Sequence, residues 1–166
     1  MTSTRDRRDE PQPGTEKDML LGFLQYERDS LIWKLDGLDD EQLRQPHPPS
    51  SLTLLGLVKH LTNVEQIWFQ DCLAGEIEPE TWDPERQWRF EPGDTATDLI
   101  GGYRAACEVS DRIVREHALD DVAARTPPHR AALTLGWILI HMVQETARHV
   151  GHADLIRESI DGRTGT

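Results

Sequence analysis

The sequence predicts an all-α protein, a four-helix bundle with a disordered N-terminal tail and long connecting loops. Three observations lead to this prediction. Four segments carry apolar residues at the three- and four-residue spacing of an amphipathic helix, and each opens with a threonine, a residue that caps helix N-termini. No segment alternates apolar and polar residues as a strand does. The 166 residues suffice for one domain with a hydrophobic core.

The chain begins with a polar tail. Residues 1–14 are charged, contain Pro11 and Pro13, and show no apolar periodicity, a pattern that is typical of disorder. The tail also lacks the apolar stretch of a signal peptide. We therefore predict a disordered tail over residues 1–14 and a single domain over residues 15–162.

The first helix is predicted over residues 16–36. Thr15 stands where a helix N-cap is expected, and Asp18, three residues later, is the partner that a capping box requires. Apolar residues then recur at helical spacing: Met19, Leu20, Phe23, Leu24, Leu31 and Leu35.

The other three helices are predicted by the same signals over residues 53–75, 95–119 and 134–162. Proline-containing loops connect them. The loop over residues 46–51 is short and rigid, and the segment over residues 75–94 holds three prolines without a clean period. Four helices with long connections favour a bundle.

Charge and cysteine usage restrict the partners. A formal net charge of -12 argues against binding to nucleic acid, because phosphate contacts need a basic face, and against binding to an anionic membrane surface. No apolar run reaches the roughly 20 residues of a membrane span. Cys72 and Cys107 have no CxxC partner, which favours free, buried thiols in a reducing compartment. We predict a cytoplasmic protein.

One stretch of the fourth predicted helix, HMVQETARHVGH (residues 141–152), carries titratable side chains where a core face is expected. At about 100° per residue, Glu145, His149 and His152 lie within about 80° of His141 on the helical wheel. Isoleucine and methionine residues share that sector, so the polar side chains lie inside the apolar stripe. Because a buried carboxylate without partners is costly, this face requires a cation or a hydrogen-bonded network.

A metal site explains this pattern. Glu145 and His149 are four residues apart, so their side chains leave the same helix face one turn apart. His60 is the only histidine on the apolar stripe of the second predicted helix. Two imidazoles and one carboxylate suit a divalent transition metal with a position left open for water or substrate, and bundles build such sites between facing helices. His60, Glu145 and His149 are therefore the candidate metal ligands.

The same residues also fit a protein without a metal. Glu145 paired with a neighbouring histidine or arginine is typical of an ordinary helix-surface pair, and His60 also fits a hydrogen-bonded histidine of the core. The spacing is not the HExxH motif of zinc proteases. His141 and His152 fit groups that orient metal ligands, or half-exposed side chains.

Two segments resemble a known family. LVKHLTNVEQIWF (residues 57–69) and ETARHVGHADLIRE (residues 145–158) are similar to the signature helices of the DinB-like superfamily, in particular to its branch related to mycothiol-dependent maleylpyruvate isomerase. The likeness extends over most of the chain, from about residue 18 to residue 160. It implies a four-helix bundle that binds a divalent metal, zinc or nickel.

The resemblance also implies which residues hold the metal. The ligand positions of the family match His60, Glu145 and His149, with glutamate at the middle position as in the isomerase-like branch. Many members have Arg-Gly-Gln after the last ligand, whereas this chain has Val-Gly-His and so places His152 there. The surroundings of the metal are therefore expected to differ from those of many members.

The resemblance implies a metal-dependent enzyme, an S-transferase or isomerase that uses a low-molecular-weight thiol of the mycothiol type as cosubstrate and acts on small electrophiles. His152 and Arg148 are the candidate catalytic residues, with Arg148 available to pair with an anionic group or with Glu145. The alternative is a non-enzymatic bundle, metal-binding or metal-free, that dimerises and binds a small ligand or a protein.

A homodimer is predicted from the fourth helix. Leu139, Val143 and Val150 lie on the side of this helix opposite the candidate ligands, and an apolar second face needs its own cover.

Overall fold

The computed structural model describes residues 10–77, 85–126 and 130–164. Over these residues the chain is helical, with one isolated bridge between Val122 and Thr134, so the predicted all-α class is confirmed. In chain order the elements are α1 (Glu16–Leu35), α2 (Asp40–Leu43), α3 (Leu54–Glu65), the π-helix η1 (Gln66–Leu73), the 3₁₀ helix η2 (Arg86–Trp88), α4 (Ala96–Glu116) and α5 (Leu135–Asp161).

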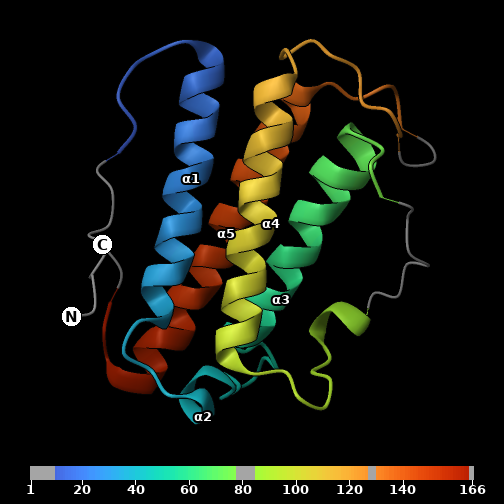
Figure 1. Cartoon of the computed structure of the whole chain (residues 1–166). Helices are drawn as coiled ribbons and strands as arrows, with labels where there is room; N and C mark the ends of the chain where they lie inside the picture. Colours follow the sequence, from blue (N-terminus) through green and yellow to red (C-terminus); the bar gives the residue numbers. More distant parts are fainter. Residues whose placement is uncertain (1–9, 78–84, 127–129, 165–166) are drawn as a thin grey trace.

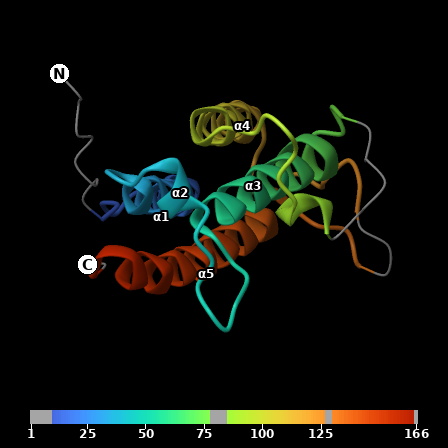
Figure 2. The same cartoon turned by 90° about the horizontal axis from the view of Figure 1, so that it is seen from below.

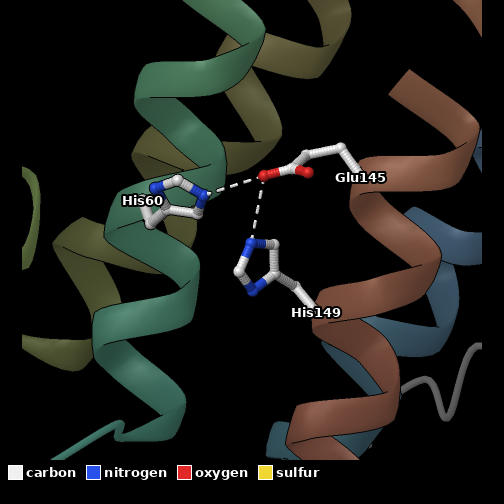
Figure 3. A group of neighbouring side chains, drawn as sticks. All are labelled: His60, Glu145 and His149. Atoms are coloured by element: carbon white, nitrogen blue, oxygen red, sulfur yellow. Dashed lines mark hydrogen bonds and ion pairs between the residues drawn. The ribbon is translucent and has the colours of Figure 1, made fainter. Parts of the chain in front are cut away.

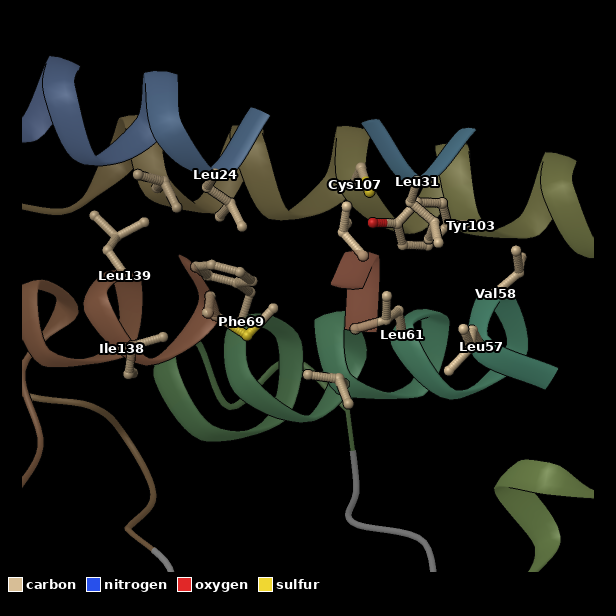
Figure 4. Packing of buried hydrophobic residues seen from close by; sticks show 14 of the residues in the cluster. Leu24, Leu31, Leu57, Val58, Leu61, Phe69, Tyr103, Cys107, Ile138 and Leu139 are labelled. Atoms are coloured by element: carbon tan, nitrogen blue, oxygen red, sulfur yellow. The ribbon is translucent and has the colours of Figure 1, made fainter. Parts of the chain in front are cut away.

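The four long helices form the predicted bundle (Figure 1). α1 lies along α5, α4 lies along α3, and α3 also contacts α5. The view from below shows α3 between α4 and α5 (Figure 2). Each long helix and η1 contribute fully buried side chains to the core (Figure 4): Leu24, Leu31, Leu57, Leu61, Phe69, Tyr103 and Ile138. None of the helices in the described ranges is long and apolar enough to cross a membrane.

All four threonines predicted as N-caps cap a helix. Each side-chain oxygen accepts a hydrogen bond from the backbone N–H three residues later, and this satisfies a donor that the helix cannot. At Thr15 the predicted partner Asp18 also takes part, but its carboxylate accepts from the threonine hydroxyl at 2.6 Å. Residues 1–9 of the predicted tail lie outside the described residues, and residues 10–14 contain no helix or strand.

The second predicted helix differs from expectation in its second half. The α-helical pattern ends at Glu65, and the backbone continues as the π-helix η1. The wider π turn changes the angle between successive side chains, so a wheel drawn at about 100° per residue no longer places residues after Glu65. The helix also ends slightly early, at Leu73, and Gly75 follows in the left-handed region with a φ of 64°.

Two further boundaries differ from the prediction. α4 ends at Glu116 rather than near Leu119, since the backbone of His117 is extended, with φ -119° and ψ 147°. The carbonyl of Leu119 then accepts from the N–H of Gly136 at the start of α5. The short helix α2 was not predicted, although Asp39 and Gln42 form a reciprocal capping box around it.

The residues that suggested a dimer are covered by their own chain. Leu139 is 0 % exposed and Val150 is 8 % exposed, and Val143 packs against the same core. These three residues of α5 therefore need no second chain to cover them. The homodimer stays a prediction.

A buried ion pair joins three helices. Arg28 of α1 donates to both carboxylate oxygens of Glu65 at 2.8 and 2.6 Å, and these two side chains are only 2 % and 1 % exposed. The same guanidinium donates to Asp111 of α4 at 2.8 Å. Since a charge this deeply buried must be paired, the network ties α1 to α3 and α4.

Removing one side of this pair should be costly. We expect Arg28→Met to lower the free energy of unfolding by about 3–5 kcal/mol, because Glu65 is left buried without its cation. The double variant Arg28→Met/Glu65→Leu should recover much of that loss. Urea unfolding at pH 7, followed by circular dichroism, measures both effects.

A matched control for this experiment lies on the surface. Arg112 makes a bidentate contact of the same kind with Glu76, at 3.1 and 2.8 Å, but both side chains are exposed. Arg112→Met should cost far less, because water and salt screen a surface pair. Equal losses in Arg28→Met and Arg112→Met would contradict the importance of burial.

Candidate metal centre

The three predicted ligands meet between two helices (Figure 3). His60 projects from the middle of α3, and Glu145 and His149 project from successive turns of α5. One ligand atom from each residue lies within 4.8 Å of the other two. α3 and α5 are in contact, so residues 85 positions apart in the sequence share one small volume.

Glu145 Oε1 is the common point of this group. It lies 3.4 Å from His60 Nε2 and 3.2 Å from His149 Nε2. The other carboxylate oxygen, Oε2, accepts a hydrogen bond from Arg148 at 3.0 Å. The ion pair with Arg148 that the sequence left open is therefore present, and it occupies the oxygen that faces away from the histidines.

Both histidines also have polar partners at Nδ1, on the side of the ring away from Glu145. His60 Nδ1 lies 2.8 Å from Gln87 Oε1 of η2, and the indole of Trp88 stacks on the His60 ring with centroids 4.4 Å apart and an interplanar angle of 12°. His149 Nδ1 lies 3.3 Å from His152 Nδ1. Each imidazole thus directs Nε2 toward Glu145 while its other nitrogen faces a second polar partner, an arrangement that is typical of metal-ligating histidines.

The site combines burial with one negative charge. The side chains of His60, Glu145 and His149 are 10, 14 and 9 % exposed. Burial lowers the pKa of His149 to about 4. His60 also lowers this pKa, whereas the negative charge of Glu145 raises it. Burial raises the pKa of Glu145, but the neighbouring histidines and Arg148 outweigh it, so the pKa falls below its usual value. At neutral pH the site offers a neutral His149 imidazole and a carboxylate, the protonation states that a metal requires.

His141 lies outside this group. Its ring stacks on Trp137, with centroids 5.2 Å apart, and meets Trp68 edge-on at 4.5 Å. Burial lowers the pKa of His141. The ring therefore belongs to an aromatic cluster one turn before Glu145, in which Trp68 packs as a half-buried side chain.

Gln87 and Trp88 were not found from the sequence. They lie in the segment over residues 75–94, which has prolines and no helical periodicity, so no pattern placed it against α3. A glutamine followed by an aromatic residue is too common a pair to indicate a site. Only the three-dimensional contact with His60 identifies them.

The fold and the site define a class of protein, the helical bundles that bring two imidazoles and a carboxylate to one point between helices. A family model described as Mycothiol-S-transferase matches residues 19–162, and the chain belongs to that family. A search of curated proteins found no match. The family assignment agrees with the resemblance predicted from residues 57–69 and 145–158.

The lowered pKa of His149 makes stability depend on pH. Between about pH 6.5, where an unfolded histidine titrates, and about pH 4, the unfolded chain binds a proton that the folded metal-free protein does not. The free energy of unfolding should therefore fall as pH decreases through this window. In His149→Gln the free energy of unfolding should change less steeply with pH. The difference in slope should correspond to at most about one proton bound on unfolding.

Urea unfolding of chelator-treated wild type and His149→Gln between pH 7 and pH 4.5 measures this contribution. The difference between wild type and His149→Gln removes the contribution of the carboxylates that titrate in the same pH range. Identical slopes would contradict a buried, neutral His149.

Proposed function

We propose that this protein is a metal-dependent thiol S-transferase that joins a thiol of the mycothiol type to a small electrophile. The observation that carries the proposal is the convergence of His60, Glu145 and His149 within 4.8 Å, in a chain of the Mycothiol-S-transferase family. The proposed unit is the single domain over residues 15–162. Two free, buried cysteines fit a reducing cytoplasm as the place of the reaction.

The contrast between Glu65, which is buried, and Glu145, which is partly buried, supports a cation at this site. Both oxygens of Glu65 are bonded to Arg28, which is buried with it. Among the Lys and Arg side chains that the structure describes, only Arg148 is paired with Glu145, and the side chain of Arg148 is 53 % exposed. Oε1 of Glu145 instead faces the edges of two imidazoles. The negative charge of Glu145 is therefore less fully balanced than that of Glu65, which is bonded at both oxygens to a buried guanidinium.

The donor set fits a divalent transition metal. Two imidazole nitrogens and one carboxylate oxygen form the three-ligand set that zinc takes in catalytic sites, where a further position remains for substrate. His60, Glu145 and His149 would hold the ion, with zinc or nickel expected from the likeness to the wider superfamily. When bound, a divalent cation supplies a Lewis acid that lowers the pKa of a coordinated thiol.

The reaction balances without a redox partner. The thiol sulfur forms a bond to an electrophilic carbon, the bond from that carbon to its leaving group breaks, and the thiol proton and the leaving group are released. His152 is a positioning residue, because its Nδ1 lies 3.3 Å from His149 Nδ1. Arg148, already beside Glu145 and about half exposed, offers its guanidinium to an anionic group of a substrate.

Substitutions should distinguish the proposed metal ligands from the residues that position them. We expect His149→Ala to abolish tight metal binding, because it removes one of three ligands from the chelate. His152→Ala should still bind metal but change the rate of thiol transfer, because an outer imidazole tunes the site without holding the ion. Titration of zinc and nickel into each chelator-treated variant measures binding, with His47→Ala as a control in the loop before α3. Loss of metal in His152→Ala with retention in His149→Ala would move the ligand position on α5.

Metal removal tests the activity itself. We expect thiol-dependent consumption of 1-chloro-2,4-dinitrobenzene, followed by absorbance, with mycothiol preferred over bacillithiol and glutathione. Chelation should abolish it, and equimolar zinc or nickel should restore it. Protein that binds metal at this site but consumes electrophile with none of these thiols would instead be the non-enzymatic metal-binding bundle.

A further inference from the structure

The ring of His60 is enclosed by a segment outside the long helices. η2 brings Gln87 against the edge of the ring and Trp88 against its face. The Trp88 indole also lies 6.2 Å from the His149 ring, so it borders two of the three candidate ligands. The segment around η2 therefore contacts the site from a direction that neither α3 nor α5 supplies.

Side chains on both flanks hold this segment against the bundle. Lys59, the residue before His60, donates to the backbone carbonyl of Arg89 at 2.6 Å and to the Asp94 carboxylate at 2.9 Å. Arg44 donates to the Asp94 carbonyl at 2.5 Å, and its guanidinium lies 4.6 Å from the centroid of the Phe90 ring. The contact with His60 is thus part of an anchored segment and not an isolated approach.

The contact between His60 and Gln87 favours one position for the proton of His60. An amide oxygen only accepts, so the Nδ1 that lies 2.8 Å from Gln87 Oε1 must carry hydrogen. In the neutral form of the ring, which is the form that binds a metal, this hydrogen is the only one, so Nε2 carries a lone pair. Nε2 then faces Glu145 Oε1 across 3.4 Å as a second acceptor. Two acceptors facing each other favour a cation between them.

We propose that Gln87 is a positioning residue that sets the tautomer of His60, and that Trp88 holds the plane of the ring, so that Nε2 is presented as a ligand before any metal arrives. This role rests on the proposed metal site, and it deepens that proposal by assigning the α3–α4 connection to it. Residues outside the ligand set that hold a metal-ligating histidine in this way typically change metal affinity by about 10- to 100-fold.

The test reads the tautomer directly, in chelator-treated protein. Long-range ¹H–¹⁵N spectra of the histidine side chains should show His60 protonated at Nδ1 in the wild type. Gln87→Leu should shift His60 toward a mixture of tautomers, and Gln87→Glu, which keeps an acceptor, should restore the Nδ1–H form. Competition with a chromophoric chelator should show zinc affinity about 10- to 100-fold lower in Gln87→Leu and close to wild type in Gln87→Glu.

Controls separate this role from folding. Gln45 is an exposed glutamine after α2, and Gln45→Leu should change neither the tautomer nor the zinc affinity. Thermal unfolding checks that the variants are folded, and Gln87→Met replaces Gln87→Leu if that variant is not. Wild-type spectra with His60 protonated at Nε2, or a Gln87→Leu protein with unchanged tautomer and affinity, would overturn the proposal.

The two proposals fail in distinguishable ways. If wild-type protein binds no zinc or nickel, the proposed function fails while the tautomer measurement still tests Gln87. If wild type binds metal and the Gln87 substitutions leave both measurements unchanged, the metal site stands and the role of Gln87 is wrong.

Discussion

The buried ion pair between Arg28 and Glu65 is the interaction on which the arrangement of the helices depends. A charged pair that is almost fully buried is stable only with both partners in place, so it ties α1 to α3. α1 in turn lies along α5. Glu65 lies on α3 just over one turn beyond His60. The pair therefore links the helix of His60, through α1, to the helix that carries Glu145 and His149.

Within that arrangement of helices, the partly buried carboxylate of Glu145 has a different environment from that of Glu65. Glu65 is neutralised by a guanidinium buried with it, whereas Glu145 faces two imidazole edges and a half-exposed arginine. One carboxylate thus serves the stability of the bundle, and the other is left able to attract a cation. Gln87 of η2 and His152 of the next turn of α5 lie beside the Nδ1 atoms of His60 and His149.

Much of the fold was predictable because its signals are local. A threonine cap and the apolar residues after it act within a few turns of chain, and all four predicted helix starts are correct. The errors arise where distant contacts decide the backbone. After Glu116 the chain leaves α4 and the carbonyl of Leu119 accepts from the N–H of Gly136, and the residues that suggested a dimer are covered by the chain itself.

The sequence by itself determined that Glu145 and His149 share a helix face, since a spacing of four residues is a property of any α-helix. It also indicated that His60 faces a core. Only the tertiary structure decided that these faces meet at one point, which oxygen of Glu145 they share, and that Gln87 and Trp88 enclose His60. The reason is physical: periodicity encodes the direction of a side chain about its own helix, whereas contacts between helices and loops depend on how the whole core packs.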